Sequence, residues 1–212
     1  MKTFRVLLLL TVAVSAIRAD VVKTVTLDTA GLGILPGGPF SLAFELADGT
    51  GSGDGNNSVV LSDFQFGFGG SPSASPLFTL GAVLGDLSST VTLTDADVAN
   101  VFVQDFVAGD TLSFLLSFTT NVDAGTPDEF IFSILDSSLN PLPTSSASPL
   151  SPFLAIDLDS ANPAILTFDG IGVPAPTVAD APSAVPEPSS AALLIIPLVA
   201  FVWAGRRKIG LA

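Results

Sequence analysis

The sequence contains no cysteine and no histidine. Without cysteine there are no disulfides and no thiolate chemistry, so the fold must be stabilised by packing. Without histidine, the commonest general base is missing, along with every Ser-His or Cys-His nucleophile pair. Tyrosine is absent too, and the single Trp203 lies near the C-terminus. Sugar-binding sites commonly use Trp or Tyr, whose rings carry a polar group, so this composition disfavours a lectin-like stacking site.

Positive charge is also scarce over most of the chain. All 20 acidic residues lie between Asp20 and Glu187, and Lys23 is the only cation in that stretch. A surface of this charge repels phosphate backbones and anionic lipid headgroups. The sequence therefore predicts no nucleic-acid partner and no peripheral membrane role, and cations are its natural counterparts.

The first residues have the order of a secretory signal peptide. Lys2 and Arg5 precede an apolar run, and small residues follow it. The small-residue rule permits cleavage after Ala16 or after Ala19, and the acidic Asp20 favours Ala19. We therefore expect export through the general secretory machinery.

The C-terminus combines three features in a fixed order. They are the motif Val185, Pro186, Glu187 and Pro188, an apolar run from Ala191 to Gly205, and the basic residues Arg206, Arg207 and Lys208. The run would form roughly 22 Å of helix at about 1.5 Å per residue, against a hydrocarbon core of about 30 Å. Pro197 weakens a helix interior, and the basic residues favour the cytoplasmic side. Such a span suits a transient hold, with an ordinary single-pass anchor as the alternative.

This three-part arrangement resembles the PEP-CTERM sorting signal. The resemblance implies recognition by an exosortase-type membrane protease, found in Gram-negative bacteria that also make exopolysaccharide, and removal of the tail. It also implies an intermediate held in the inner membrane, followed by release or attachment at the cell surface or in the extracellular space. The expectation at the family level is a surface or matrix protein associated with biofilm or exopolysaccharide.

Between the two ends, apolar residues alternate with polar ones at a period of two, which is typical of half-buried strands. The expected strands are 21–28, 40–47, 63–68, 90–94, 101–107, 111–119, 130–134, 153–157 and 164–169. Turn residues separate them, and no helical period occurs outside the chain ends. The pattern predicts an all-β fold, an antiparallel, jelly-roll-like β-sandwich of about eight or nine strands whose core is built from phenylalanine.

The chain is thus expected to have four parts. They are a signal peptide (1–19), the β-sandwich domain (20–171), a Pro/Ala-rich extended spacer (172–184) and the sorting signal (185–212) with its hydrophobic transmembrane helix and basic tail.

One loop has the composition of a cation site. Glycines alternate with Asp48, Asp54, Asn56 and Asn57, whose oxygens are ligands of the kind that surround Ca²⁺. The spacing is not that of an EF-hand, because Val59 stands where the bidentate Glu would be. The alternative is a plain strand connection in which Gly and Asn take positive φ. A second candidate is the loop 121–129.

Two acidic pairs, Asp95 with Asp97 and Asp157 with Asp159, have a spacing that places both carboxylates on one face of a strand. Paired carboxylates serve glycosidases, but Asp is also common in turns next to strands, and the aromatics of a sugar cleft are missing. We therefore expect a non-enzymatic surface or matrix protein. The alternative is a Ca²⁺-dependent module that binds carbohydrate such as exopolysaccharide, and a hydrolase ranks third.

Overall fold

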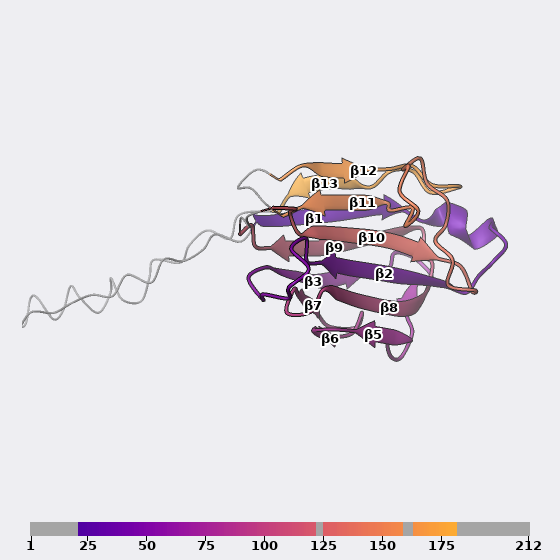
Figure 1. Ribbon diagram of the computed structural model, residues 1–212. Coiled ribbons are helices and arrows are strands. Elements are labelled where there is room, and N and C mark those ends of the chain that lie inside the picture. The colour runs from indigo at the N-terminus through magenta and orange to yellow at the C-terminus, as the bar shows by residue number, and fades with distance from the viewer. Residues whose placement is uncertain (1–20, 122–124, 159–162, 182–212) are drawn as a thin grey trace, which may run out of the picture. The chain divides into compact units, whose positions relative to one another are not determined.

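The computed structural model describes residues 21–121, 125–158 and 163–181, which form two antiparallel sheets packed face to face (Figure 1). The first sheet has the order β13 (Thr177–Asp180), β1 (Val21–Asp28), β9 (Thr111–Phe118), β3 (Ser58–Gln65), β7 (Val91–Thr94), β6 (Val83–Gly85). The second has the order β12 (Ile165–Thr167), β11 (Leu154–Asp157), β10 (Glu129–Leu135), β2 (Phe40–Ala47), β8 (Ala99–Val107), β4 (Ser71–Pro72), with β5 (Phe78–Leu80) also pairing with β8. The all-β sandwich expected from the alternation is confirmed.

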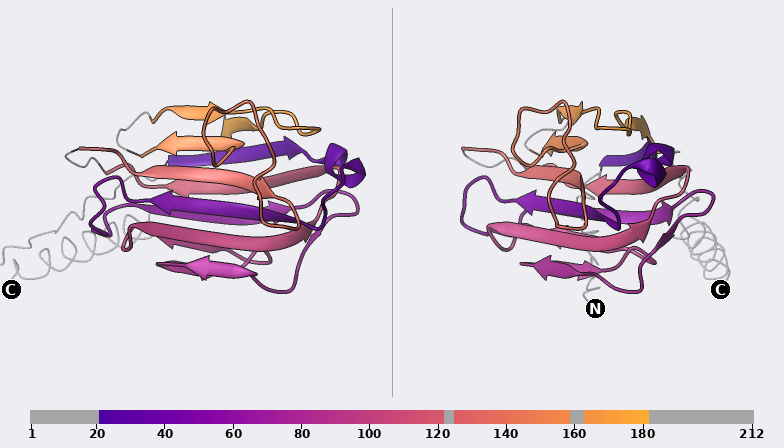
Figure 2. Two further views of the ribbon diagram at one scale, coloured as in Figure 1. Left: turned by 45° about the vertical axis from the view of Figure 1, so that its right-hand side comes forward. Right: turned by 90° about the vertical axis from the view of Figure 1, so that its right-hand side faces the viewer.

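The chain crosses repeatedly from one sheet to the other, because β1, β3 and β9 belong to the first sheet and β2, β8 and β10 to the second. The connections therefore gather at the two ends of the sandwich. The only helix of the described residues, the 3-10 helix η1 (Ala30–Ile34), follows β1 at one end, and the loop between β2 and β3 lies at the other (Figures 1 and 2).

The predicted inward faces are the buried ones. The fully or almost fully buried residues include Phe40, Leu42, Phe44 and Leu46 of β2, Leu112, Phe114, Leu116 and Phe118 of β9, and Phe130, Phe132 and Ile134 of β10. At the centre, the Phe44 ring lies 5.3 Å from that of Phe132 and 5.7 Å from that of Phe114, measured between centroids. Phenylalanine suits this position because its ring has no polar group that needs a buried partner.

The third predicted strand needs correction. The alternation of Phe64, Phe66 and Phe68 suggests a strand over 63–68, but β3 ends at Gln65 and Phe68 is 91 % exposed. Asp63 has a φ of 52°, and the pairing with β9 shifts register between Ser62 and Gln65. This irregularity breaks the two-residue period, so the alternation cannot continue to Phe68.

The predicted spacer over 172–184 also differs from the structure. Thr177–Asp180 forms β13, an edge strand paired with β1, and the compact unit that holds the sandwich continues to Ala181. The Lys23 ammonium on β1 lies 2.5 Å from the Asp180 carboxylate. Pro176 has no N–H to donate, which explains why the pairing stops at Thr177.

The described residues form thirteen strands, more than the eight or nine expected. The four additional ones, β4, β5, β6 and β13, have two to four residues each, and all lie on sheet edges. Strands this short show too few alternations to stand out in a sequence.

The predicted signal peptide with its cleavage site at Ala19 and Asp20, the sorting motif at 185–188, the hydrophobic helix and the basic residues 206–208 lie outside the described residues. Within the described ranges, no helix is long and apolar enough to cross a membrane.

Candidate functional site

Three connections meet at the end of the sandwich where β2 ends, and they bring four polar side chains into the interior. These are Asp48, Asn57, Asp95 and Asp128, each at most 6 % exposed, and we refer to them as the strand-end cluster. Asp48 and Asn57 bound the connection between β2 and β3, Asp95 directly follows β7, and Asp128 directly precedes β10. Buried polar groups of this kind require hydrogen-bond partners or bound ligands.

Asn57 connects the segments of this cluster. Its Nδ2 donates to Asp128 Oδ2 (2.7 Å) and to the carbonyl oxygen of Asn121 (3.1 Å). Its Oδ1 accepts from the Thr119 hydroxyl (3.0 Å) and from the Asn121 backbone N–H (2.8 Å). Its own backbone N–H donates to Asp95 Oδ2 (2.9 Å). Asn57, predicted as a cation ligand, is therefore engaged through both polar atoms of its amide with the other loops.

Asp48, the first predicted ligand, is bonded to its own loop. Its carboxylate accepts the backbone N–H groups of Thr50, Gly51, Ser52 and Gly53 and the hydroxyl of Thr50. Burial favours the neutral acid, but the hydrogen bonds from Thr50, Gly53 and Gly51 outweigh it and lower the pKa of Asp48. The negative charge of Asp48 thus holds the glycine-rich loop in its turn.

Two glycines allow this loop to lie against its neighbours. A Cβ on Gly49 would collide with the carbonyl oxygens of Thr126 and Pro127, and one on Gly53 would lie 2.6 Å from that of Ala96. The loop is therefore packed between the segment before Asp128 and the turn after Asp95. The positive φ expected of glycines in this connection is found at Gly51, Gly53 and Gly55 (71°, 65° and 72°), and Gly49 and Gly53 also permit close approach of backbones.

Of the other two predicted ligands, Asp54 is exposed and Asn56 is partly buried. Asp54 accepts from the backbone N–H (3.1 Å) and the Nδ2 (3.0 Å) of Asn56. In the described part of the chain, no three or more Asp or Glu side chains form a group that could hold a metal ion by themselves. The four predicted ligands are thus divided between the loop's own turns and the contact with Asp128.

Asp95 and Asp128 lie close together in the fold, which the sequence does not predict. Asp95 is completely buried, and its Oδ1 has no hydrogen-bond partner. Burial, followed by a hydrogen bond with the Asp128 carboxyl group and the charges of Asp128 and Asp54, raises the pKa of Asp95 to about 7, against the effect of the Asn57 N–H. The sequence spacing of Asp95 and Asp128 does not predict their contact, because only the tertiary fold brings the end of β7 to the start of β10.

Of the two acidic pairs singled out by spacing, only Asp95 with Asp97 lies within the described residues, and these two do not form a pair. Asp95 is buried and Asp97 exposed, so they share no cleft, and Asp159 lies outside the described residues. Asp157 instead stands opposite Glu129 on the neighbouring strand. Burial, the Asp157 charge and the Glu45 charge together raise the pKa of Glu129.

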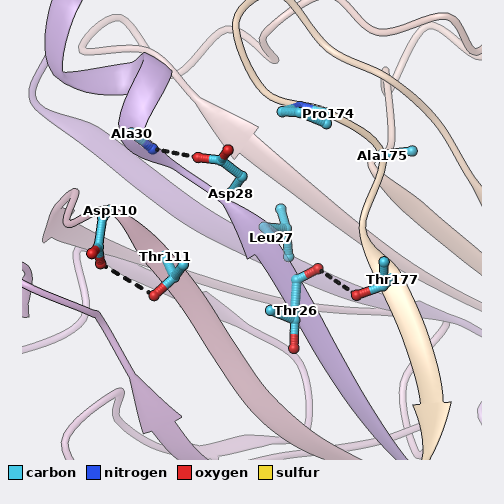
Figure 3. Close-up of a pocket in the computed structure, with 9 residues that line it drawn as sticks. All are labelled: Thr26, Leu27, Asp28, Ala30, Asp110, Thr111, Pro174, Ala175 and Thr177. Atoms are coloured by element: carbon cyan, nitrogen blue, oxygen red, sulfur yellow. Dashed lines mark hydrogen bonds between the residues drawn. The ribbon is translucent and has the colours of Figure 1, made fainter.

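A groove of about 520 Å³ lies at the other end of the sandwich, beside the end of β1 (Figure 3). Its carboxylates hold adjacent turns: Asp28 accepts from the Ala30 N–H (3.1 Å), and Asp110 accepts from the Phe68 N–H (2.9 Å) and the Thr111 hydroxyl (3.2 Å). The groove lies between the end of β1 and the segment that precedes β13, where Pro174 and Ala175 are not paired with β1. Its two carboxylates are thus engaged in the fold itself.

Comparison with protein-family models, with curated proteins and with solved structures finds no match to this chain. Its function must therefore be inferred from its own residues.

Proposed function

We propose that this protein is a non-enzymatic exported protein of the cell surface or extracellular matrix, delivered through its C-terminal sorting signal. The observation that carries the proposal is the order of the Pro186-Glu187-Pro188 motif, the apolar run and the basic residues 206–208 at the end of the chain. An exosortase-type protease in the inner membrane is the partner that this order implies.

The end of the folded unit supports this proposal. The compact unit that contains the sandwich ends at Ala181, ahead of the Pro-Glu-Pro motif. Its last strand is attached to β1 by the ion pair between Lys23 and Asp180 and by a hydrogen bond from the Ala181 N–H to the Val22 carbonyl (3.2 Å). Cleavage beyond Ala181 would remove no strand from either sheet, so the tail can be lost without opening the sandwich.

The hydrogen bond from the Ala181 N–H to the Val22 carbonyl places the first and last described residues side by side. Val21 lies opposite Phe118, which also pairs with Val59, so the chain enters the first sheet at the end that carries the strand-end cluster. A domain entered and left at one point is suited to being presented from a membrane and then released there.

Composition supports a binding or structural role over catalysis. The chain has no histidine, cysteine or tyrosine, and the carboxylates of Asp28, Asp48 and Asp110 hold turns. The acidic surface suits a soluble matrix component that interacts with cations and with neutral polymers such as exopolysaccharide.

Intact-mass analysis of the protein recovered from the surface of its native host tests the proposal. We expect a chain that begins near Asp20 and lacks Arg206 to Ala212. Replacing Glu187 with Gln, or deleting residues 206–208, should leave the protein in the inner membrane or mislocalise it. Asp63→Asn, which removes an exposed charge from β3, should be sorted normally.

A surface-located protein with its tail intact would refute processing. Normal sorting of both tail variants would refute the sorting signal and leave a generic anchor.

A further inference from the structure

The two carboxyl groups of Asp95 and Asp128 pose an electrostatic problem inside the domain. They are 0 % and 1 % exposed, and they lie close enough to interact directly. Two ionised carboxylates buried together repel strongly and lose their hydration, so at least one charge must be compensated. Among the described residues, Lys23 is the only basic side chain, and it pairs with Asp180. The pair must therefore either share a proton or bind a cation from the solution.

The hydrogen bonds around the pair leave one oxygen open. Asp128 Oδ1 accepts from the Gly49 N–H (2.9 Å), and its Oδ2 accepts from Asn57 Nδ2 (2.7 Å). Asp95 Oδ2 accepts from the Asn57 N–H (2.9 Å). Asp95 Oδ1 is fully buried and accepts no hydrogen bond from an N–H or hydroxyl group of the described residues. An orphaned carboxylate oxygen of this kind is costly unless a proton or a cation occupies the position next to it.

We propose that the strand-end cluster binds one Ca²⁺ ion between the carboxylates of Asp95 and Asp128. The donors are hard oxygens with no nitrogen or sulfur ligand, which suits Ca²⁺ better than transition metals. Ca²⁺ also tolerates irregular coordination and accepts carbonyl and water oxygens in addition to carboxylates, whereas Mg²⁺ demands an octahedron and retains its water.

This Ca²⁺ site, centred on Asp95 and Asp128, differs from the one predicted from the sequence, which is centred on the glycine-rich loop. Asp48 is committed to its own loop, whereas the charge of Asp54 acts on Asp95 and makes Asp54 a further carboxylate for the site. With two principal carboxylates, the affinity belongs in the range of extracellular Ca²⁺ modules, at about 10⁻⁴ to 10⁻³ M. The ion would hold together the ends of β7 and β10 and the loop after β2. This inference does not rest on the sorting of the protein.

The test uses the full chain, purified in a non-ionic detergent at pH 7.5. Equilibrium dialysis against radioactive Ca²⁺ should give one bound ion per chain. The melting temperature should rise by roughly 5–10 °C when the Ca²⁺ concentration is about a hundredfold above Kd. MgCl₂ and NaCl of matched ionic strength serve as comparisons, because any salt screens the repulsion within this acidic domain.

The decisive variant is Asp95→Asn, which keeps the shape of the side chain and removes its charge. We expect it to lose Ca²⁺ binding and the Ca²⁺-specific shift. The matched control Asp63→Asn removes one exposed carboxylate at a φ of 52° that Asn tolerates. It should bind Ca²⁺ as the natural chain does.

Absence of Ca²⁺ binding to the natural chain overturns the proposal without reference to any variant, so a failure of Asp95→Asn to fold leaves the test intact. Equal shifts in all three salts overturn it as well and indicate screening. Asp95→Asn that is at least as stable as the natural chain, with Ca²⁺ affecting neither protein, would show that the two carboxyl groups share a proton instead.

Discussion

The rings of Phe114 and Phe132 meet edge to face across the sandwich, with centroids 5.6 Å apart and planes at 86°. Phe114 belongs to β9 of the first sheet and Phe132 to β10 of the second. This contact joins the two layers at the middle of the core, and edge-to-face geometry is one of the favourable arrangements for aromatic pairs.

Removing either ring should therefore leave a cavity between the sheets. We expect Phe114→Ala and Phe132→Ala each to lower the free energy of unfolding by about 3–5 kcal/mol, measured by urea denaturation. Phe68→Ala is the control, because that ring is 91 % exposed and its loss should change stability little. Near-neutral core variants, or a costly Phe68→Ala, would contradict the assigned faces.

The ion pair between Lys23 and Asp180 should help to hold the edge strand β13 on β1. Lys23 hydrogen-bonds Asp180, and this contact followed by the charge of Lys23 lowers the pKa of Asp180. Because Asp180 is 88 % exposed, solvent screens the ion pair and Lys23→Gln should change the overall stability little. Amide hydrogen exchange of β13 should accelerate, and the exchanged pair Lys23→Glu with Asp180→Lys should restore protection. Unchanged exchange in Lys23→Gln would show that backbone pairing alone holds β13.

The close approach of the loop at Gly49 predicts a steric effect. An alanine there would press its Cβ against the backbone of Thr126 and Pro127, so Gly49→Ala should destabilise the fold by about 1–3 kcal/mol. At Gly33 a Cβ meets nothing within 4 Å, so Gly33→Ala should be nearly neutral. Equal thermal stabilities of the two variants would refute the packing of the loop.

The facing carboxylates of Glu129 and Asp157 predict a pH effect. The pKa of Glu129 is raised above its ordinary value of 4.5, so the folded state binds a proton more readily than the unfolded state. Stability from this group is therefore present below pH 4.5 and is lost as the pH rises through the raised pKa. Glu129→Gln removes this loss and should stabilise the protein at pH 7 by about 0.2–1 kcal/mol.

Denaturation at pH 4 and pH 7 checks this expectation, with Asp63→Asn as the control for general charge reduction. A Glu129→Gln variant with the same pH dependence as the natural chain would contradict it.

Local alternation was enough to predict the central strands. In β2 and β9 the apolar residues recur at every second position, and that period places Phe44 and Phe114 on the buried face whatever the topology. Alternation does not reveal the short strands β4, β5, β6 and β13 or the break at Asp63. A strand of three or four residues owes its existence to the neighbour it pairs with, and a register shift leaves no mark on composition.

For function, the sequence alone predicts an export signal and a sorting motif, which depend on local order, and it determines the acidic composition of the domain. It also indicated the glycine-rich loop, although not the role of Asp48 within it. Only the tertiary structure decided that Asp95 and Asp128 face each other and that Asn57 links them. These residues come from different connections, and their meeting depends on how β2, β7 and β10 are arranged in two packed sheets.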